Sequence, residues 1–486
     1  MRLPFTRSRN NNHILKQSAS WEALCFFVRA GAVSPFSDDL SLKAACESVI
    51  IVMIVWQKNK KAGYRQPGKG DRMKVLLADF HKCVKYSGGI ERVLSNMAAA
   101  LHERGHEVTV VFADEKEGAP FFPLPEGVRY CNLFHIKSLG TVKQDFLIKA
   151  LREILRPISR EAARDQNYRL LRKAKKHCEA VLKWEQPDVV ISFREPTTRL
   201  LIAGADAYMP VISMLHNDPD EIFRGMPEEE KKSLMESAFV QVLLPSFKKK
   251  AEDLLHFEQK PYDKDRIVVI PNAVSPAKFE TDPGAARKIH TITCVGRLTG
   301  RTKRQHLLVE AFAKLAAGFP DWQVELWGDT YDKAYVAKLK GEIKKAGLGD
   351  RILIKGVTKD MESVWKKTDI FAFPSHHEGF GLGLAEAMSY GLPAVGYKNC
   401  PAVNELIEDG KTGFLVDDGT EPLKEALEML MRDPELRRSY GKAGKAAMEA
   451  YRPDVVWDAW DALIQKAAPM KRKAKPEDVF DPFKLG

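Results

Sequence analysis

Two carboxylate side chains, Glu378 and Glu386, flank a glycine-rich stretch in the segment 376–393. The apolar run 369–375 just upstream is typical of a buried parallel strand, and a helix-forming sequence follows the glycines. Such a turn leaves backbone N–H groups unpaired at the positive end of a helix, where a phosphate or a polar sugar can bind. Because Glu386 lies about two helical turns beyond Glu378, both carboxylates can face one cleft. The alternative is an ordinary strand–helix unit with two solvated glutamates.

The whole segment resembles the E-x7-E motif of retaining glycosyltransferases of family 4, which have the GT-B fold. The Glu-Gly-Phe-Gly start and the Glu-Ala-Met-Ser-Tyr-Gly-Leu-Pro finish both match that pattern. The resemblance implies that Glu386 binds the ribose hydroxyls of a nucleotide-sugar donor. It also implies that Glu378 and the backbone after it hold the donor sugar and its diphosphate. These backbone positions are Gly379, Phe380, Gly381 and Leu382.

Fixed cations are the second requirement, because transfer from a nucleotide sugar must stabilise a departing diphosphate. The family carries an arginine after a strand glycine and a lysine that opens the next helix, and Arg297 matches the arginine. Lys303 is the best match for the lysine, although it lies one residue later than usual and Arg304 follows where glycine is frequent. Arg301 and Arg304 are therefore alternative second cations. A further alternative is that all of these are surface charges of a helix.

Metal ligands are not evident in the sequence. No Asp-x-Asp motif follows a predicted strand, and Asp417-Asp418 lies in an expected turn. Hard cations need several convergent oxygen ligands. We therefore expect a metal-independent reaction, with no cofactor and with a UDP- or GDP-linked sugar as co-substrate.

Three residues of the N-terminal half also match the family. Gly88 and Gly89 lie in the first strand–helix turn, where the absence of a Cβ lets backbone amides approach a donor phosphate or the acceptor. The alternative is a flexible helix start, and residues 90–93 are expected to pack behind the site. His216 follows the buried strand 210–215 on the ligand-binding edge and matches the family histidine that contacts the donor sugar. Weaker candidates are Glu195 on the same rim and Asn217 and Asp218 on the acceptor side. Ser246 and Asn272 are further candidates, with ordinary turn positions as the alternative, and Glu405 is expected near the donor base or simply on a helix.

Two series of alternating strands and helices must position these residues. The first is expected to contain strands 74–80, 107–114, 188–193, 210–215 and 240–246, a helix at 88–106, and one or two charged helices over 148–184. The second is expected to contain strands 291–298, 323–329, 351–357, 369–375 and 393–398, helices 305–317 and 333–345, a turn at 409–416 and further helices to about 452. The pattern predicts an α/β protein with two Rossmann-like, doubly wound domains facing across a cleft. The resemblance, over about residues 73–465, implies the same GT-B pair, with a final helix 453–466 that crosses back onto the first domain.

The domain boundaries follow from these series. At 486 residues, with 44% hydrophobic and 29% charged residues, the chain has room for two ordinary domains. We expect a poorly structured extension at 1–72 and an acceptor-side domain at 73–280. A donor-binding domain is expected at 281–452, and a crossover helix with a basic tail at 453–486. Met73 opens a strand directly and is an alternative natural start of the protein.

The net charge of +11 is assigned to the two ends of the chain. Residues 1–72 hold 12 Lys and Arg against 5 Asp and Glu, and residues 466–486 hold 6 against 3. The basic run 471–475 favours an anionic membrane surface, with a solvated tail as the alternative. The apolar run 49–56 is too short to span a bilayer, and the seven dispersed cysteines are typical of a reducing compartment. We expect a cytoplasmic protein without a nucleic-acid partner, with peripheral membrane contact as one alternative.

The predicted function is transfer of a hexose from a nucleoside-diphosphate sugar to a hydroxyl of a saccharide or lipid-linked acceptor, in the synthesis of cell-surface polysaccharide or glycolipid. The resemblance implies retention of the anomeric configuration. No residue stands out as a covalent nucleophile, so front-face attack assisted by the leaving diphosphate is expected. Acceptor choice is expected to lie around residues 116–144 and 148–184. The alternatives are a nucleotide-sugar epimerase of the same fold and a non-catalytic nucleotide-sugar-binding protein.

Overall fold

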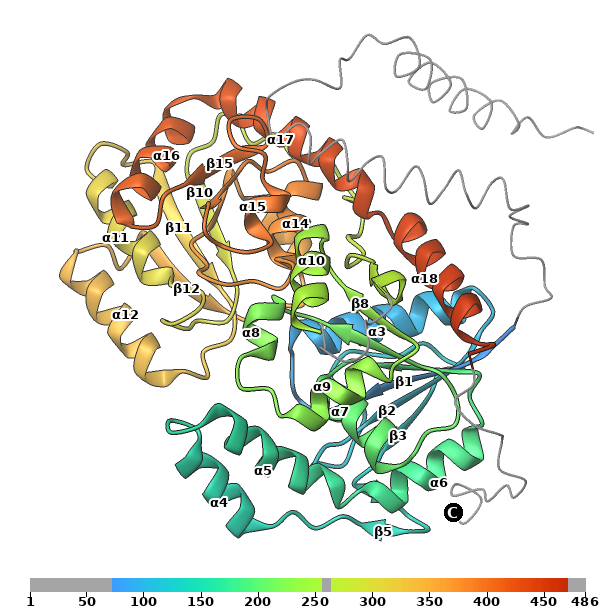
Figure 1. The fold of residues 1–486 in the computed structure, drawn as a ribbon. Helices are drawn as coiled ribbons and strands as arrows, with labels where there is room; N and C mark the ends of the chain where they lie inside the picture. Colours follow the sequence, from blue (N-terminus) through green and yellow to red (C-terminus); the bar gives the residue numbers. More distant parts are fainter. Residues whose placement is uncertain (1–71, 256–263, 471–486) are drawn as a thin grey trace, which may run out of the picture. The chain divides into compact units, whose positions relative to one another are not determined.

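The computed structural model describes residues 72–255 and 264–470. The extension predicted at 1–72, apart from its last residue, lies outside these ranges, as do the apolar run 49–56 and the basic run 471–475. The elements discussed below are those of the described ranges, and Figure 1 shows their arrangement.

The first half of the described chain is built on a seven-stranded sheet with the order β3-β2-β1-β6-β7-β8-β9, in which every neighbouring pair is parallel. The strand order reverses between β1 and β6, and such a reversal opens a ligand crevice at the carboxyl ends of the strands. The strands are β1 Lys74–Asp79, β2 Glu107–Phe112, β3 Arg129–Asn132, β6 Val189–Ser192, β7 Val211–Leu215, β8 Phe239–Val242 and β9 Ile267–Val269. A small antiparallel hairpin of β4 His135–Ile136 and β5 Gly140–Thr141 follows β3 along the chain.

The helices of this half are α3 Gly89–Glu103, α4 Phe146–Leu155, α5 Arg160–Arg172, α6 Lys175–Glu185, α7 Glu195–Arg199, α8 Pro219–Phe223, α9 Glu228–Met235 and α10 Pro245–Leu254, with a π-helical turn at Leu200–Gly204 and a 3-10 turn at Lys264–Arg266. Three helices, and not one or two, occupy the stretch 148–184. Pro157 and the capping hydroxyl of Ser159, which accepts a hydrogen bond from the amide of Ala162, separate α4 from α5. A short turn then separates α5 from α6.

The second half contains a six-stranded parallel sheet with the order β12-β11-β10-β13-β14-β15. Its strands are β10 His290–Val295, β11 Trp322–Trp327, β12 Ile352–Gly356, β13 Ile370–Phe373, β14 Ala394–Tyr397 and β15 Gly413–Val416. Its helices are α11 Gln305–Leu315, α12 Lys333–Lys345, α13 Met361–Trp365, α14 Leu382–Ser389, α15 Val403–Leu406, α16 Thr420–Arg432 and α17 Pro434–Ala447. The two parallel sheets make the chain an α/β protein, as the alternating pattern predicts.

The edge strand β15 corrects the expected turn at 409–416. Gly413 pairs with Ala394 on β14, and a Cβ at Gly413 would overlap the carbonyl oxygen of Ala394. The backbone therefore approaches its neighbour more closely than a side chain would allow. Strands β3 and β9 were not predicted either, because each is a short edge strand of three or four residues.

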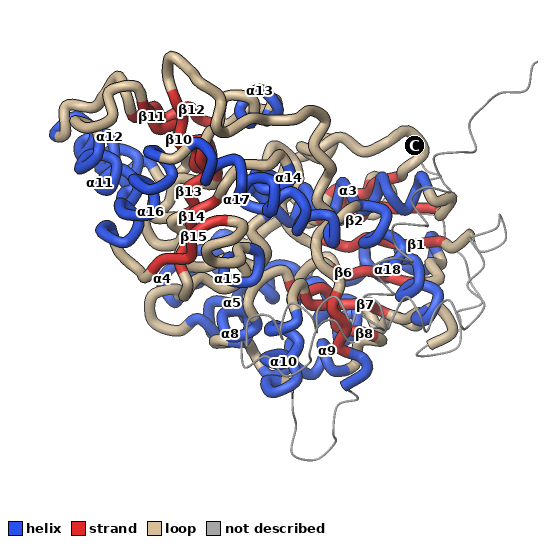
Figure 2. Tube along the Cα trace, turned by 90° about the horizontal axis from the view of Figure 1, so that it is seen from above, coloured by secondary structure: helices blue, strands red, loops and turns tan. Residues whose placement is uncertain are grey.

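The last helix, α18 Pro453–Ala467, packs against α3 of the first half, as expected (Figures 1 and 2). Its buried Trp457 and Trp460 share one apolar cluster with residues of β1, β2 and α3. Asp461 of α18 pairs with Arg104 at 3.0 Å and with His106 at 3.2 Å. The chain therefore returns to its first sheet after completing the second. Within the described ranges, no helix has the length and apolar character needed to cross a bilayer.

Candidate active site

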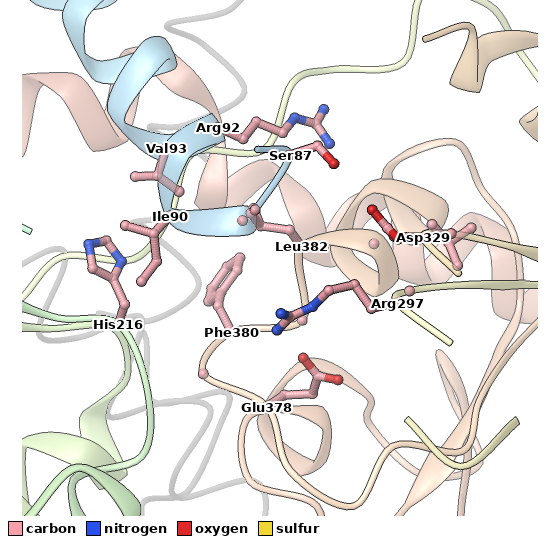
Figure 3. Close-up of a pocket in the computed structure, with 18 of the residues that line it drawn as sticks. Ser87, Ile90, Arg92, Val93, His216, Arg297, Asp329, Glu378, Phe380 and Leu382 are labelled. Atoms are coloured by element: carbon pink, nitrogen blue, oxygen red, sulfur yellow. The ribbon is translucent and has the colours of Figure 1, made fainter. Parts of the chain in front are cut away.

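One cleft of about 1930 Å³ lies between the carboxyl edges of the two sheets and is lined by residues of both halves (Figure 3). Its side chains come from loops that follow strands and from the first turns of helices, because parallel strands present all their carboxyl ends at one edge. The cleft brings together every candidate site residue of the main set. They are Gly88, Gly89, His216, Arg297, Lys303, Glu378, Gly379, Phe380, Gly381, Leu382 and Glu386.

The backbones of the two halves meet at Gly379. A Cβ on this residue would overlap the carbonyl oxygen of His216, which follows β7 in the opposite half. Glycine is required here because the two backbones are in direct contact. Gly381 then adopts a left-handed conformation (φ +81°) and precedes α14, whose first turn opens into the cleft. The predicted combination of a glycine turn and a helix start is therefore present.

Glu386, in the second turn of α14, has a partner from across the cleft. Arg92 of α3 places Nη2 2.5 Å from Glu386 Oε1 and donates from Nη1 to Oε2 at 3.2 Å. Burial raises the pKa of the Glu386 carboxyl, and the Arg92 charge acts in the opposite direction. The carboxylate is therefore desolvated and held by a single guanidinium.

Lys303 pairs with Glu378 through a hydrogen bond from Nζ to Oε1, and its ammonium lies 5.1 Å from the centre of the Phe373 ring. Arg304, by contrast, pairs through Nη1 with both carboxylate oxygens of Asp418 at 2.9 Å and stacks on Tyr397. The Arg304 charge is thus neutralised by Asp418. The Lys303 charge is paired as well, but its partner Glu378 lines the cleft and Asp418 does not, which favours Lys303 over Arg304 as the second cation of the cleft.

Arg297 follows β10 and is exposed in the cleft. Among the described residues, none forms a hydrogen bond or an ion pair with its side chain. Figure 3 shows the guanidinium reaching into the open space beside Phe380 and Glu378. A fixed cation without a protein counterion is suited to binding an anion that enters the cleft.

His216 stacks on Phe193, with ring centroids 5.5 Å apart and an interplanar angle of 19°. Its Nε2 is buried, and no described residue offers it a hydrogen bond. Burial, and secondarily the charge of Arg194, lower the pKa of His216 to about 3, so the imidazole is neutral at physiological pH. A buried nitrogen without a partner needs one, and a sugar hydroxyl has the right chemistry.

The first turn of α3 corrects the expectation that residues 90–93 pack behind the site. Ile90, Arg92 and Val93 all line the cleft, and Figure 3 shows this turn facing it. Arg92 is thus a residue that the sequence interpretation missed. A signal was present, because an arginine stands in the first turn of a helix whose first glycines were already assigned to the site.

A buried ion cluster supports the same turn. Arg194, after β6, donates from Nε to Asp79 at 2.6 Å and from Nη2 to Glu91 at 2.6 Å. Asp79 is fully buried at the end of β1, and burial raises its pKa despite the nearby guanidinium. Removing Arg194 would leave Asp79 without its guanidinium partner and Glu91 with only His81 at 3.6 Å, so we expect Arg194 to stabilise the turn that follows Gly88 and Gly89.

The weaker rim candidates divide into two groups. Glu195, Asn217 and Asn272 line the cleft. Asp218 is buried and pairs with Lys250 at 2.8 Å, while Ser246 donates a hydrogen bond to Glu405. The last three residues do not line the cleft, and Glu405 lies on helix α15, which is one of its two expected positions. Ser246 and Glu405 instead join α10 of the first half to α15 of the second.

The rim contributed by the first half carries four arginines that no motif had indicated. Two of them, Arg160 and Arg224, share Glu221 at 2.9 and 3.0 Å. Arg164 donates to the carbonyl of Ile222 and pairs with Glu230, both at 2.7 Å. With Arg156, these side chains line the outer part of the cleft. In the parts of the chain that the structure describes, no group of three or more His, Cys, Asp or Glu side chains is arranged to hold a metal ion.

Comparison with known proteins gives two adjacent family matches. The Glycosyltransferase Family 4 model matches residues 87–278, and the Glycosyl transferases group 1 model matches residues 278–447. The chain is 32% identical over 201 residues to the exopolysaccharide phosphotransferase SCO2592 of Streptomyces coelicolor, and the match covers 41% of this chain and 21% of that protein. The chain thus spans about a fifth of that relative's length.

Two further matches extend over most of the chain. The phosphatidyl-myo-inositol mannosyltransferase of Mycolicibacterium smegmatis is 26% identical over 396 residues, covering 78% of this chain and 89% of that protein. The crystal structure of HepE from Anabaena in complex with UDP and glucose aligns with a TM-score of 0.58 at 18% identity. It covers 81% of this chain and 100% of that one. The two-sheet fold is therefore the GT-B fold.

Proposed function

We propose that this chain, which belongs to the group 1 glycosyltransferases, transfers a hexose from a UDP- or GDP-linked donor to a hydroxyl of a saccharide or lipid-linked acceptor. The observation that carries the proposal is the convergence of Arg297, Lys303, Glu378, Glu386 and His216 on one cleft. Relatives named as a mannosyltransferase and as an exopolysaccharide phosphotransferase support a role in making polysaccharide or glycolipid.

The diphosphate binds next to Arg297 and Lys303 and at the amino-terminal turn of α14. Cations and unpaired backbone amides stabilise the charge that develops when the sugar–phosphate bond breaks. Arg297 is available because no described carboxylate neutralises it. This arrangement provides leaving-group stabilisation by side chains and backbone, and the proposed reaction uses no metal ion.

The nucleoside and the sugar bind on either side of the diphosphate. Glu386 accepts hydrogen bonds from the ribose hydroxyls, and these replace or rearrange its contacts with Arg92. The Nε2 of neutral His216 contacts a hydroxyl of the transferred sugar, while Glu378 positions the same sugar from the second half. HepE was crystallised in complex with UDP and glucose, which is consistent with a donor of this class.

The proposed chemical step retains the anomeric configuration. The bond between the anomeric carbon and the diphosphate oxygen breaks, and the acceptor oxygen attacks the same face of the sugar. The acceptor proton passes to the departing diphosphate oxygen, so no protein base is required. We propose that the protein carries out this reaction in the cytoplasm.

Product analysis with radiolabelled UDP- and GDP-hexoses tests the proposal. The expected result is release of UDP or GDP together with transfer of label to an acceptor, and loss of donor binding in Glu386→Ala. Glu425→Ala, which removes an exposed carboxylate of α16 outside the cleft, is the matched control. Recovery of the label only in a second nucleotide sugar would indicate an epimerase. Donor binding without nucleotide release, with every acceptor class tried, would indicate a binding protein.

A further inference from the structure

Helix α4 exposes apolar side chains and buries none. Leu147, Leu151 and Ile154 recur at the i, i+4 and i+7 positions and form one stripe, with exposed fractions of 76%, 41% and 62%. Ile158, in the turn after the helix, is 74% exposed. Six of the thirteen exposed large apolar residues in the described ranges fall within residues 139–158.

The polar side of α4 faces the protein. Lys149 donates to Glu115 at 2.6 Å, and Arg152 donates to the side chain of Asn167 on α5 at 3.0 Å. The helix packs against α5, and Figure 1 shows the two as a pair. An ordinary surface helix buries its apolar side and exposes its polar side, so the orientation of α4 is reversed. Exposed apolar patches of this kind mark interaction sites.

The segment that carries the stripe is strongly basic. Residues 137–176 contain twelve Lys and Arg against four Asp and Glu. The assignment of the basicity to the chain ends therefore missed a strongly basic segment in the middle, whose charge is balanced by acidic residues elsewhere. Lys137, Lys143, Arg156, Arg169 and Lys173 are exposed members of this segment. An apolar stripe flanked by basic residues fits the interface of an anionic lipid bilayer.

The stripe is continuous with the mouth of the cleft. Ile158 lies between Arg156 and Arg160 in the sequence, and both arginines line the cleft. A surface that covers the stripe therefore lies beside the arginine-rich rim. A second copy of the chain is a poorer occupant, since pairing two such segments would bring like charges together.

We propose that α4 and the turn to Ile158 dock on an anionic lipid surface, with the apolar stripe inserted at the headgroup level and the basic segment facing anionic headgroups. Docking places the arginine-lined mouth of the cleft at the membrane, where an anionic lipid-linked acceptor would be presented. Only this last consequence rests on the proposed function; the docking itself does not.

The test measures binding of the full chain to phosphatidylcholine vesicles with and without phosphatidylglycerol, in the absence of donor. The variant Leu151→Glu/Ile154→Glu alters two exposed side chains, so its folding should be unchanged. Met429→Glu/Ile289→Glu, which changes the charge equally at two other exposed apolar positions, is the matched control. We expect salt-sensitive binding of the wild type and the control to the anionic vesicles, and a loss of at least about tenfold in the α4 variant.

Three results would overturn the proposal. The first is absence of wild-type binding to either vesicle, and the second is equal binding by the α4 variant, which would place the contact elsewhere in the chain. The third is a wild-type dimer in light scattering that the α4 variant dissociates, which would identify a second copy as the occupant. Nucleotide release with a soluble acceptor, measured on the same variants, separates these outcomes from failure of the proposed function, because docking requires no turnover.

Discussion

Arg92 Nη2 of α3 lies 2.5 Å from Glu386 Oε1 of α14, so an ion pair bridges the two halves of the protein across the cleft. The carboxylate that the E-x7-E resemblance assigns to the donor ribose therefore has a protein partner. Because burial raises the pKa of Glu386 while Arg92 opposes that shift, Arg92 helps to keep this carboxylate ionised and ready to accept hydrogen bonds.

Arg92→Ala is expected to make donor binding sensitive to pH. Without the guanidinium, the pKa of Glu386 rises further, and the fraction of carboxylate falls as the pH is lowered. Donor affinity in the variant should therefore begin to weaken at a higher pH than that of the wild type. Donor titrations at several pH values provide the measurement, with Arg432→Ala on α16, which removes an exposed arginine outside the cleft, as the control. Parallel pH profiles for Arg92→Ala and the wild type would contradict this role.

His216 should not titrate in the working range of the protein. Its pKa is lowered to about 3, chiefly by burial, so the imidazole stays neutral between about pH 5 and 8, the interval in which an ordinary histidine changes charge. We expect donor KM of the wild type and of His216→Gln to depend on pH in the same way between about pH 5 and 8. A transition present in the wild type and absent in the variant would show that the histidine becomes charged and would rule out its proposed role as a neutral partner.

Lys303→Ala should mainly lower turnover, whereas Arg304→Ala should mainly lower thermal stability. Lys303 faces Glu378 in the cleft, and loss of one leaving-group stabiliser is expected to lower kcat by about 10²–10³-fold. Arg304 is held by Asp418, so its removal should mainly lower Tm and leave kcat within about tenfold of the wild type. Nucleotide release and thermal unfolding of both variants make the comparison. The opposite pattern would make Arg304 the second cation.

Gly379→Ala should impair closure of the two halves. The added Cβ would overlap the carbonyl of His216, and relief of such overpacking typically costs about 1–3 kcal/mol. We expect weaker donor binding and lower kcat, with little change in Tm if each half stays folded. Gly341→Ala on α12 is the control, since its Cβ meets open space and alanine favours a helix. Wild-type donor affinity in Gly379→Ala would show that the contact is dispensable.

Much of the fold and the convergence of the site residues could be predicted from the sequence. Buried strands end shortly before His216, Arg297 and Glu378. Parallel strands bring their carboxyl ends to one edge of a sheet, so residues that follow such strands lie at that edge. This rule identifies an edge without knowledge of tertiary contacts. It explains why residues far apart in the sequence could be assigned to one cleft.

What could not be predicted depends on contacts between elements. The reach of Arg92 to Glu386 requires the placement of one half against the other, which no local pattern contains. The periodicity of α4 indicates an apolar stripe but not that α5 packs on the opposite side. Short edge strands such as β15 gain their order from a neighbour, so their own sequences resemble turns.

The return of α18 to the first sheet has a consequence for biosynthesis. Trp457 and Trp460 complete an apolar cluster whose other members are translated hundreds of residues earlier. The N-terminal half therefore leaves the ribosome with an uncovered core surface, and it stays incomplete until the last helix has emerged. A nascent chain stalled before residue 453 should remain protease-sensitive in its N-terminal half, even though every strand of that sheet has already been made.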